Sequence, residues 1–335
     1  MQHFNVELKE LYPFLGEDGR APRLEAFLPD NVASKYRESD LLPAILVLPG
    51  GGYGFTSDRE GEPIALRFLS HGYNVFILWY SVEPHHDPVQ IVEVAAAADA
   101  IRKNAGAWHV DADKLVIMGF SAGGHLAAYF SNRYDCEAVR EHFPDGLGVN
   151  ACVLGYPVIT SGEYTHIYSM QALLGLQPTP EELEYFSLEK QVKENTPPCF
   201  LWQTLEDNLV PVENTYLFAK ALKEKGVPYA QYVYPHGGHG LSTASMELFS
   251  GWHGGEYVCE QIGFALERIK NNTAVNMNPR RRAELVAQFH LEPAEGEANA
   301  PAPGPGPGFE PPKTNPFADV ATWVELSRIW FERFL

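Results

Sequence analysis

The residues that could do chemistry centre on a serine flanked by glycines, in residues 119–123 (GFSAG). The apolar, β-branched run before it, residues 114–118 (KLVIM), predicts a buried strand, and residues 125–130 predict a helix. A strand, a G-x-S-x-G turn and a helix make a nucleophile elbow, which holds a serine hydroxyl above the edge of a parallel sheet. Glycines suit this turn because the strand and helix backbones approach too closely for a Cβ atom. We therefore expect Ser121 to be a nucleophile.

A serine hydroxyl is a poor nucleophile and needs a base that a third group orients. Where an elbow carries the serine, an acid and then a histidine follow it along the chain. Asp207 fits the acid, because it follows a predicted strand at residues 199–203 (CFLWQ). A carboxylate there would accept the imidazole N–H and stabilise the imidazolium. Glu206 is the nearest rival, and an aspartate in this position can also be a turn or helix-capping residue.

The base is predicted in the glycine-rich residues 235–240 (PHGGHG), which follow a predicted strand at residues 229–234. A tight loop of this kind can bring an imidazole over the serine. His239 fits the base, and His236 competes with it because spacing alone does not separate the two.

A tetrahedral intermediate carries an oxyanion, which needs preorganised N–H donors. One candidate is the backbone of Ala122, directly after the nucleophile. Gly51 and Gly52 are the others, in residues 49–54 (PGGGYG) after the predicted strand at 44–48. A phosphate cradle is the alternative for this glycine run, but neither a P-loop nor a Rossmann glycine motif is present. An oxyanion hole is favoured.

Three aromatic residues near the ends of predicted strands could line an acyl or sugar pocket, although they could equally be core residues: Tyr53, Trp79 and Tyr80. The other histidines lack metal-ligand spacing with carboxylates, so we expect neither a metal nor a cofactor. Those histidines include His85, His86, His109, His125 and His166.

Predicted strands alternate with predicted helices, which indicates a doubly wound α/β fold with a mostly parallel sheet and helices on both faces. The strands are expected at residues 44–48, 74–79, 115–118, 151–154, 199–203 and 229–234, and the helices at 64–70, 88–107 and 212–225. Residues 4–8 and 23–27 are expected to add antiparallel strands at one edge.

Composition changes after residue 248. We expect a catalytic domain in residues 1–248 and 316–335, ending in a helix at 316–334, and an insertion at 249–315. Within the insertion, residues 292–312 are rich in Pro, Gly, Ala and Glu and predict a flexible linker. The insertion is expected to be a surface excursion, with a lid or an oligomer contact near the site as the alternative. Residues 279–290 form a basic and then amphipathic segment, in which Arg280, Arg281 and Arg282 are expected to begin a solvated helix, with a binding patch as the alternative.

The chain has 335 residues, of which 45% are hydrophobic and 20% charged, with a formal net charge of −18. It can bury a sizeable core, and its acidity argues against nucleic acid or an anionic membrane as a partner. The four cysteines, Cys136, Cys152, Cys199 and Cys259, form no C-x-x-C pair and predict a reducing compartment. With no signal-peptide pattern and no membrane-spanning run, we expect a cytoplasmic protein, with a homo-oligomer left open.

Four motifs together resemble the α/β-hydrolase superfamily: PGGGYGF at 49–55, GFSAGGHLAA at 119–128, LEDNLVPVENT at 205–215 and HGGHGL at 236–241. Within it, the chain is similar to the esterase/lipase branch that includes bacterial acetyl xylan esterases and feruloyl-esterase-like members. The resemblance implies that Ser121, Asp207 and His239 are nucleophile, acid and base, and that Gly51, Gly52 and Ala122 bind the oxyanion. Pro49 stands where lipases have histidine, which favours the sugar-esterase members. The insertion at residues 249–315 is a departure from the pattern of this esterase family.

These residues predict a serine carboxylic-ester hydrolase with a small-molecule ester substrate, deacetylating small acetylated sugars or xylo-oligosaccharides. One alternative is a peptidase of the prolyl-oligopeptidase type, although the chain has no room for the propeller domain of those enzymes. A lipase-like esterase of longer acyl chains and a non-catalytic hydrolase-fold binding module are the others.

Overall fold

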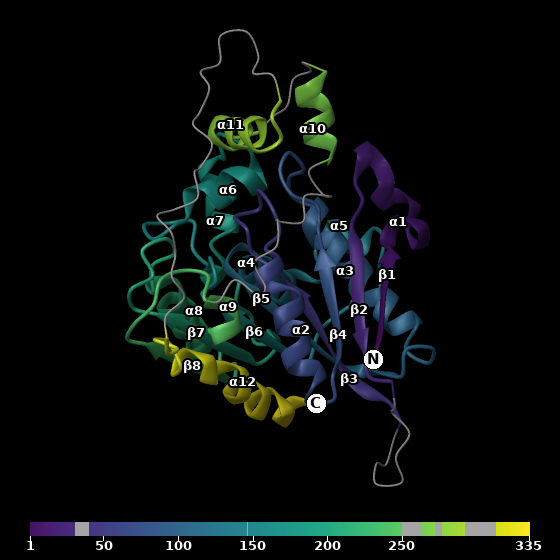
Figure 1. Cartoon of the computed structure of the whole chain (residues 1–335), viewed down its shortest axis with the longest axis vertical. Coiled ribbons are helices and arrows are strands. Elements are labelled where there is room, and N and C mark those ends of the chain that lie inside the picture. Colours follow the sequence, from purple (N-terminus) through teal and green to yellow (C-terminus); the bar gives the residue numbers. More distant parts are fainter. Residues whose placement is uncertain (31–39, 146, 250–262, 272–276, 292–312) are drawn as a thin grey trace.

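An eight-stranded sheet runs through the computed structural model (Figure 1), which describes residues 1–30, 40–145, 147–249, 263–271, 277–291 and 313–335. The strand order is β1-β2-β4-β3-β5-β6-β7-β8. Strands β3 to β8 are parallel, whereas β2 pairs antiparallel with both β1 and β4. The strands are β1 Gln2–Glu7, β2 Arg23–Leu28, β3 Leu42–Leu48, β4 Asn74–Trp79, β5 Val110–Phe120, β6 Ala151–Gly155, β7 Cys199–Thr204 and β8 Tyr229–Tyr234.

Both faces of the sheet are buried, because alternate residues of each central strand enter different apolar clusters. In β5, Leu115 and Ile117 face the cluster that includes residues of helices α3 and α8, whereas Val116 and Met118 face the cluster with α2 and α12. The helices are α1 Leu8–Leu11, α2 Glu62–Leu69, α3 Val89–Lys103, α4 Ser121–Arg133, α5 Glu137–Arg140, α6 Ile167–Leu174, α7 Pro180–Tyr185, α8 Glu213–Glu224, α9 Met246–Phe249, α10 Gly263–Lys270, α11 Pro279–Gln288 and α12 Trp323–Phe331.

The predicted doubly wound α/β architecture and its antiparallel edge strands are therefore confirmed. The final helix also returns to the sheet, because Trp323 of α12 stacks on Trp202 of β7 with ring centroids 5.1 Å apart. None of the helices in the described part of the chain has the length and apolar character needed to cross a bilayer.

The predicted insertion contributes two helices to the described structure, α10 and α11. Figure 1 shows α11 beside α6, at the end of the molecule opposite α12. The predicted linker at residues 292–312 lies outside the described residues.

Candidate active site

Ser121 occupies the turn between β5 and α4, with a φ of 53° that non-glycine residues seldom adopt. The turn is as crowded as the motif predicts. A Cβ on Gly119 would lie 2.1 Å from the carbonyl oxygen of Gly123, and a Cβ on Gly123 would lie 2.1 Å from that of Leu48. Only glycine fits at these two positions, so the strained backbone of Ser121 is held in place by close packing.

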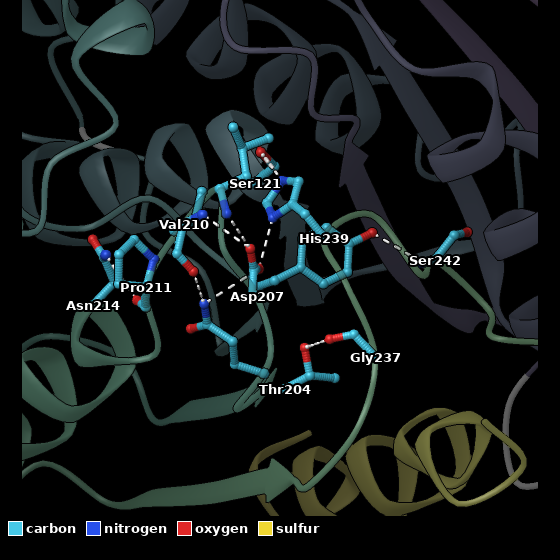
Figure 2. Close-up of polar contacts among 12 residues, drawn as sticks. Ser121, Thr204, Asp207, Val210, Pro211, Asn214, Gly237, His239 and Ser242 are labelled. Carbon is cyan, nitrogen blue, oxygen red and sulfur yellow. Dashed lines mark hydrogen bonds and ion pairs between the residues drawn. The ribbon is translucent and has the colours of Figure 1, made fainter. Parts of the chain in front are cut away.

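The imidazole of His239 lies between Ser121 and Asp207 (Figure 2). Its Nε2 is 2.8 Å from Ser121 Oγ, and its Nδ1 is 2.7 Å from Asp207 Oδ2. Because a carboxylate only accepts hydrogen bonds, Nδ1 carries the proton and donates it to Asp207. The lone pair of Nε2 then accepts the hydrogen of the Ser121 hydroxyl, and the imidazole is oriented to remove that proton.

Asp207 follows β7 and its side chain is fully buried. Its Oδ1 accepts the backbone N–H groups of Leu209 at 3.0 Å and Val210 at 2.9 Å. These donors stabilise the carboxylate and fix its orientation, so Oδ2 is left to face His239.

The neighbouring acid and histidine form a separate pair at the surface. His236 Nδ1 lies 3.0 Å from Glu206 Oε1, and their side chains are 70% and 56% exposed. The structure thus places His239 between Ser121 and Asp207, and places His236 against Glu206.

Gly51 and Gly52 lie in the loop after β3, and both line the same cavity as Ser121. Both have positive φ, 130° for Gly51 and 64° for Gly52. A hydrogen bond within the loop stabilises this conformation, because Gly51 O accepts the N–H of Gly54 at 3.0 Å. Ala122 follows Ser121 at the start of α4 and is fully buried. The structure therefore brings the three predicted oxyanion donors to the elbow.

A buried glutamate that sequence reasoning did not identify lies beneath this loop. Glu60 Oε2 accepts the N–H of Gly50 at 2.6 Å, and Glu60 Oε1 accepts the hydroxyl of Tyr156 at 2.6 Å. Burial raises the pKa of Glu60, and these two hydrogen bonds oppose that rise. The ring of Tyr156 in turn packs against the imidazole of His239, with centroids 5.0 Å apart. No sequence signal pointed to Glu60, because it follows no strand and belongs to no motif.

The elbow opens into a cavity of about 440 Å³, which is lined by Ser121, His239, the glycine loop and residues of α6 and α11. His166, just before α6, is one of its lining residues, and its Nδ1 lies 2.8 Å from Ser169 Oγ. Burial lowers the pKa of His166 to about 4, so its imidazole is neutral near pH 7. No sequence pattern placed His166 in the site, because metal binding was the one role its residue type suggested.

The prediction that Tyr53, Trp79 and Tyr80 line a substrate pocket is wrong. Tyr53 is fully buried and its hydroxyl lies 2.8 Å from Nδ1 of His125. Tyr80 is also fully buried and donates to Pro49 O, and Trp79 is 3% exposed and donates to Glu25. All three side chains belong to the core and not to the wall of the cavity, and the polar atom of each has a hydrogen-bond partner.

The prediction of a solvated helix start at Arg280–282 is wrong for Arg281. Its side chain is only 15% exposed and lines the cavity, and its Nε donates to Gly54 O at 3.1 Å. Sequence periodicity predicted an amphipathic segment here, but the contact with a loop more than 200 residues earlier is tertiary. In the part of the chain that the structure describes, no cluster of His, Cys, Asp or Glu is arranged to hold a metal ion.

The BD-FAE family model matches residues 30–222 of the chain. Endo-1,4-beta-xylanase B of Butyrivibrio fibrisolvens is 48% identical over 245 residues, which are 70% of this chain and 38% of that protein. The acetylxylan esterase of Xylanibacter ruminicola is 31% identical over 234 residues, which are 68% of this chain and 45% of that protein. This chain thus spans less than half the length of each of these curated relatives.

Among solved structures, an acetyl ester-xyloside bifunctional hydrolase from Caldicellulosiruptor lactoaceticus is 33% identical, with a TM-score of 0.66. The match covers 79% of this chain and 96% of that one. The predicted α/β-hydrolase fold and the resemblance to acetyl xylan esterases are confirmed by these findings.

Proposed function

The chain belongs to the BD-FAE family, and from that premise we propose that it is a serine carboxylic-ester hydrolase that removes acetyl groups from small acetylated sugars or xylo-oligosaccharides. One observation carries the proposal: His239 lies within hydrogen-bond distance of both Ser121 and Asp207, 2.8 Å from one and 2.7 Å from the other. A nucleophile, a base and an orienting acid in this geometry are what acyl transfer requires.

In the proposed mechanism, Ser121 Oγ attacks the ester carbonyl carbon while His239 Nε2 takes the hydroxyl proton. The carbonyl oxygen becomes an oxyanion, which accepts the N–H groups of Ala122, Gly51 and Gly52. As the intermediate collapses, the bond to the sugar oxygen breaks and His239 protonates that oxygen. The product of this half-reaction is an acetylated Ser121 and a free alcohol.

Water completes the cycle by the same route. His239 takes a proton from the attacking water, a second tetrahedral intermediate forms, and its collapse releases acetate and returns the proton to Ser121. Asp207 keeps its hydrogen bond to Nδ1 of His239 and stabilises the imidazolium. No redox step and no group beyond the chain and water are needed for these bonds to form and break.

The saccharide substrate is supported by two kinds of observation. The relatives include a xylanase, an acetylxylan esterase and an acetyl ester-xyloside hydrolase. The side chains that line the cavity include the charged residues Arg59, Glu83 and Glu284, which can form hydrogen bonds with the hydroxyl groups of a saccharide. The cytoplasmic location expected from the sequence stays a prediction.

The proposal is tested by hydrolysis of p-nitrophenyl esters from acetate to octanoate, together with acetate release from acetylated xylo-oligosaccharides. We expect the rate to fall as the acyl chain lengthens and acetate to be released from the saccharides. A rate that peaks at longer acyl chains, with no acetate release, would reassign the protein to lipase-like esters.

A further inference from the structure

Helix α11 of the insertion is docked at the mouth of the cavity by contacts at its first turns. The backbone N–H of Asn278 donates to Glu83 Oε1, and the amide of Asn278 donates to Gln171 of α6 at 3.0 Å. Arg281 adds the bond to Gly54 O. On its inner side, Leu285 is fully buried in the main apolar cluster. Apolar and polar contacts together make this helix a wall of the site.

The face that α11 turns to the cavity carries paired charges. Arg281 Nη1 lies 3.4 Å from Glu284 Oε2, and Arg280 Nε lies 3.1 Å from Glu284 Oε1. Both guanidinium groups also lie over aromatic rings, with Arg281 5.5 Å from the Phe55 ring centre and Arg280 5.5 Å from that of Tyr168. The cavity is lined by all five of these side chains as well as by Ser121 and His239.

This arrangement offers donors, an acceptor and aromatic faces within one cavity that also holds the reacting groups. A sugar hydroxyl both donates and accepts, so it can accept from a guanidinium while it donates to a carboxylate. Arg281 Nη1 and Glu284 Oε2 are 3.4 Å apart, which is a long hydrogen bond, so a hydroxyl beside the pair can bond to both groups at little cost. The ring faces of Phe55 and Tyr168 can pack against the C–H groups of a sugar.

We propose that Arg281 and Glu284 form the subsite for the alcohol part of the ester, and that they select a saccharide by hydrogen bonds to its hydroxyl groups. This inference rests on the proposed function and adds to it the residues that choose the alcohol. An apolar alcohol would bury the two charged groups without replacing their bonds to water.

The test compares Arg281→Met with Arg282→Met, the adjacent arginine, which does not line the cavity. For each protein, kcat and KM are measured on an acetylated xylobiose and on p-nitrophenyl acetate, which has no sugar. For Arg281→Met, we expect kcat/KM on the saccharide to fall relative to that on the aryl ester by about 10- to 100-fold, mainly through KM. Arg282→Met should keep the wild-type ratio.

Equal losses on both substrates would overturn the inference, because Arg281 would then only support the glycine loop through Gly54. Wild-type kcat/KM of Arg281→Met on both substrates would overturn it as well. A loss of kcat/KM confined to a uronate-bearing ester would also overturn it. Glu284→Gln, which removes the negative charge and one of the two acceptor oxygens and keeps the shape, should lower the same ratio and serves if Arg281→Met does not fold.

The two proposals fail in different ways. If the wild type cleaves the aryl ester and leaves acetylated saccharides intact, the proposed saccharide substrate and the proposed subsite are both wrong. If the wild type cleaves both substrates and the variants keep the wild-type ratio, only the subsite is wrong. Titration of acetylated xylobiose into Ser121→Ala and into Ser121→Ala with Arg281→Met gives a second readout, in which the double variant should bind more weakly.

Discussion

Glu60 holds the start of the glycine loop, because its buried carboxylate accepts the backbone N–H of Gly50 at 2.6 Å. The same carboxylate accepts the hydroxyl of Tyr156, whose ring packs against His239. A single side chain therefore connects the loop that carries two candidate oxyanion donors to the residue that supports the base. We infer that Glu60 is a positioning residue for the site.

Replacing Glu60 with alanine should lower kcat by about 10- to 100-fold with a smaller change in KM, because the oxyanion donors lose their alignment. The Gly50 N–H and the Tyr156 hydroxyl would also lose a buried partner, so the melting temperature should fall. Steady-state kinetics on p-nitrophenyl acetate and thermal unfolding measure the two effects. Glu62→Ala is the matched control, since Glu62 is an exposed residue at the start of α2. If Glu60→Ala kept the wild-type kcat, Glu60 would not be a positioning residue for the site.

Asp207→Asn should reduce kcat by about 10⁴-fold, by analogy with the serine-protease case, because an amide does not hold the required imidazole tautomer. Glu206→Gln is the natural comparison, since it changes the adjacent carboxylate, which pairs with the exposed His236. We expect that variant to keep near wild-type turnover. If Glu206→Gln lost more activity than Asp207→Asn, the assignment of the acid would be reversed.

His125 should make folding stability depend on pH. Burial lowers its pKa from 6.5 to about 4 in the folded protein, so the unfolded chain binds the proton more readily between these values. The contribution of His125 to the free energy of unfolding is therefore most favourable above pH 6.5, where the imidazole is neutral in both states. It falls as the pH drops toward 4, by about 3 kcal/mol in total for a shift of this size.

The measurement is the free energy of unfolding in urea at about pH 7 and about pH 4.5, for which His125→Asn should lose about 2 kcal/mol less than the wild type on acidification. Equal losses in wild type and His125→Asn would show that other groups set the acid sensitivity.

The sequence predicted the parts of this protein that local patterns determine. Continuous apolar runs located the central strands, and the glycines around Ser121 predicted a turn in which a Cβ does not fit. The order of strands along the chain brought Asp207 and His239 near the serine, but it did not separate them from Glu206 and His236. That distinction depends on which side chains point inward, and the rivals lie only one residue apart for the acid and three residues apart for the histidine.

Tertiary packing determined what the sequence could not predict. Tyr53 and Tyr80 occupy the expected loop and strand end, yet both are fully buried beneath the site, where neighbouring polar groups satisfy their hydroxyls. Arg281 lies in a segment with an ordinary amphipathic pattern, and its place in the cavity follows from the docking of α11 on α6 and on the glycine loop.

Covalent labelling with a fluorophosphonate, followed by peptide mapping, tests most directly whether Ser121 is the nucleophile. We predict a single adduct on Ser121 in the wild type and protection from labelling by an acetyl ester. Ser121→Ala should show neither labelling nor ester hydrolysis. An adduct on another residue, or full hydrolysis by Ser121→Ala, would contradict it.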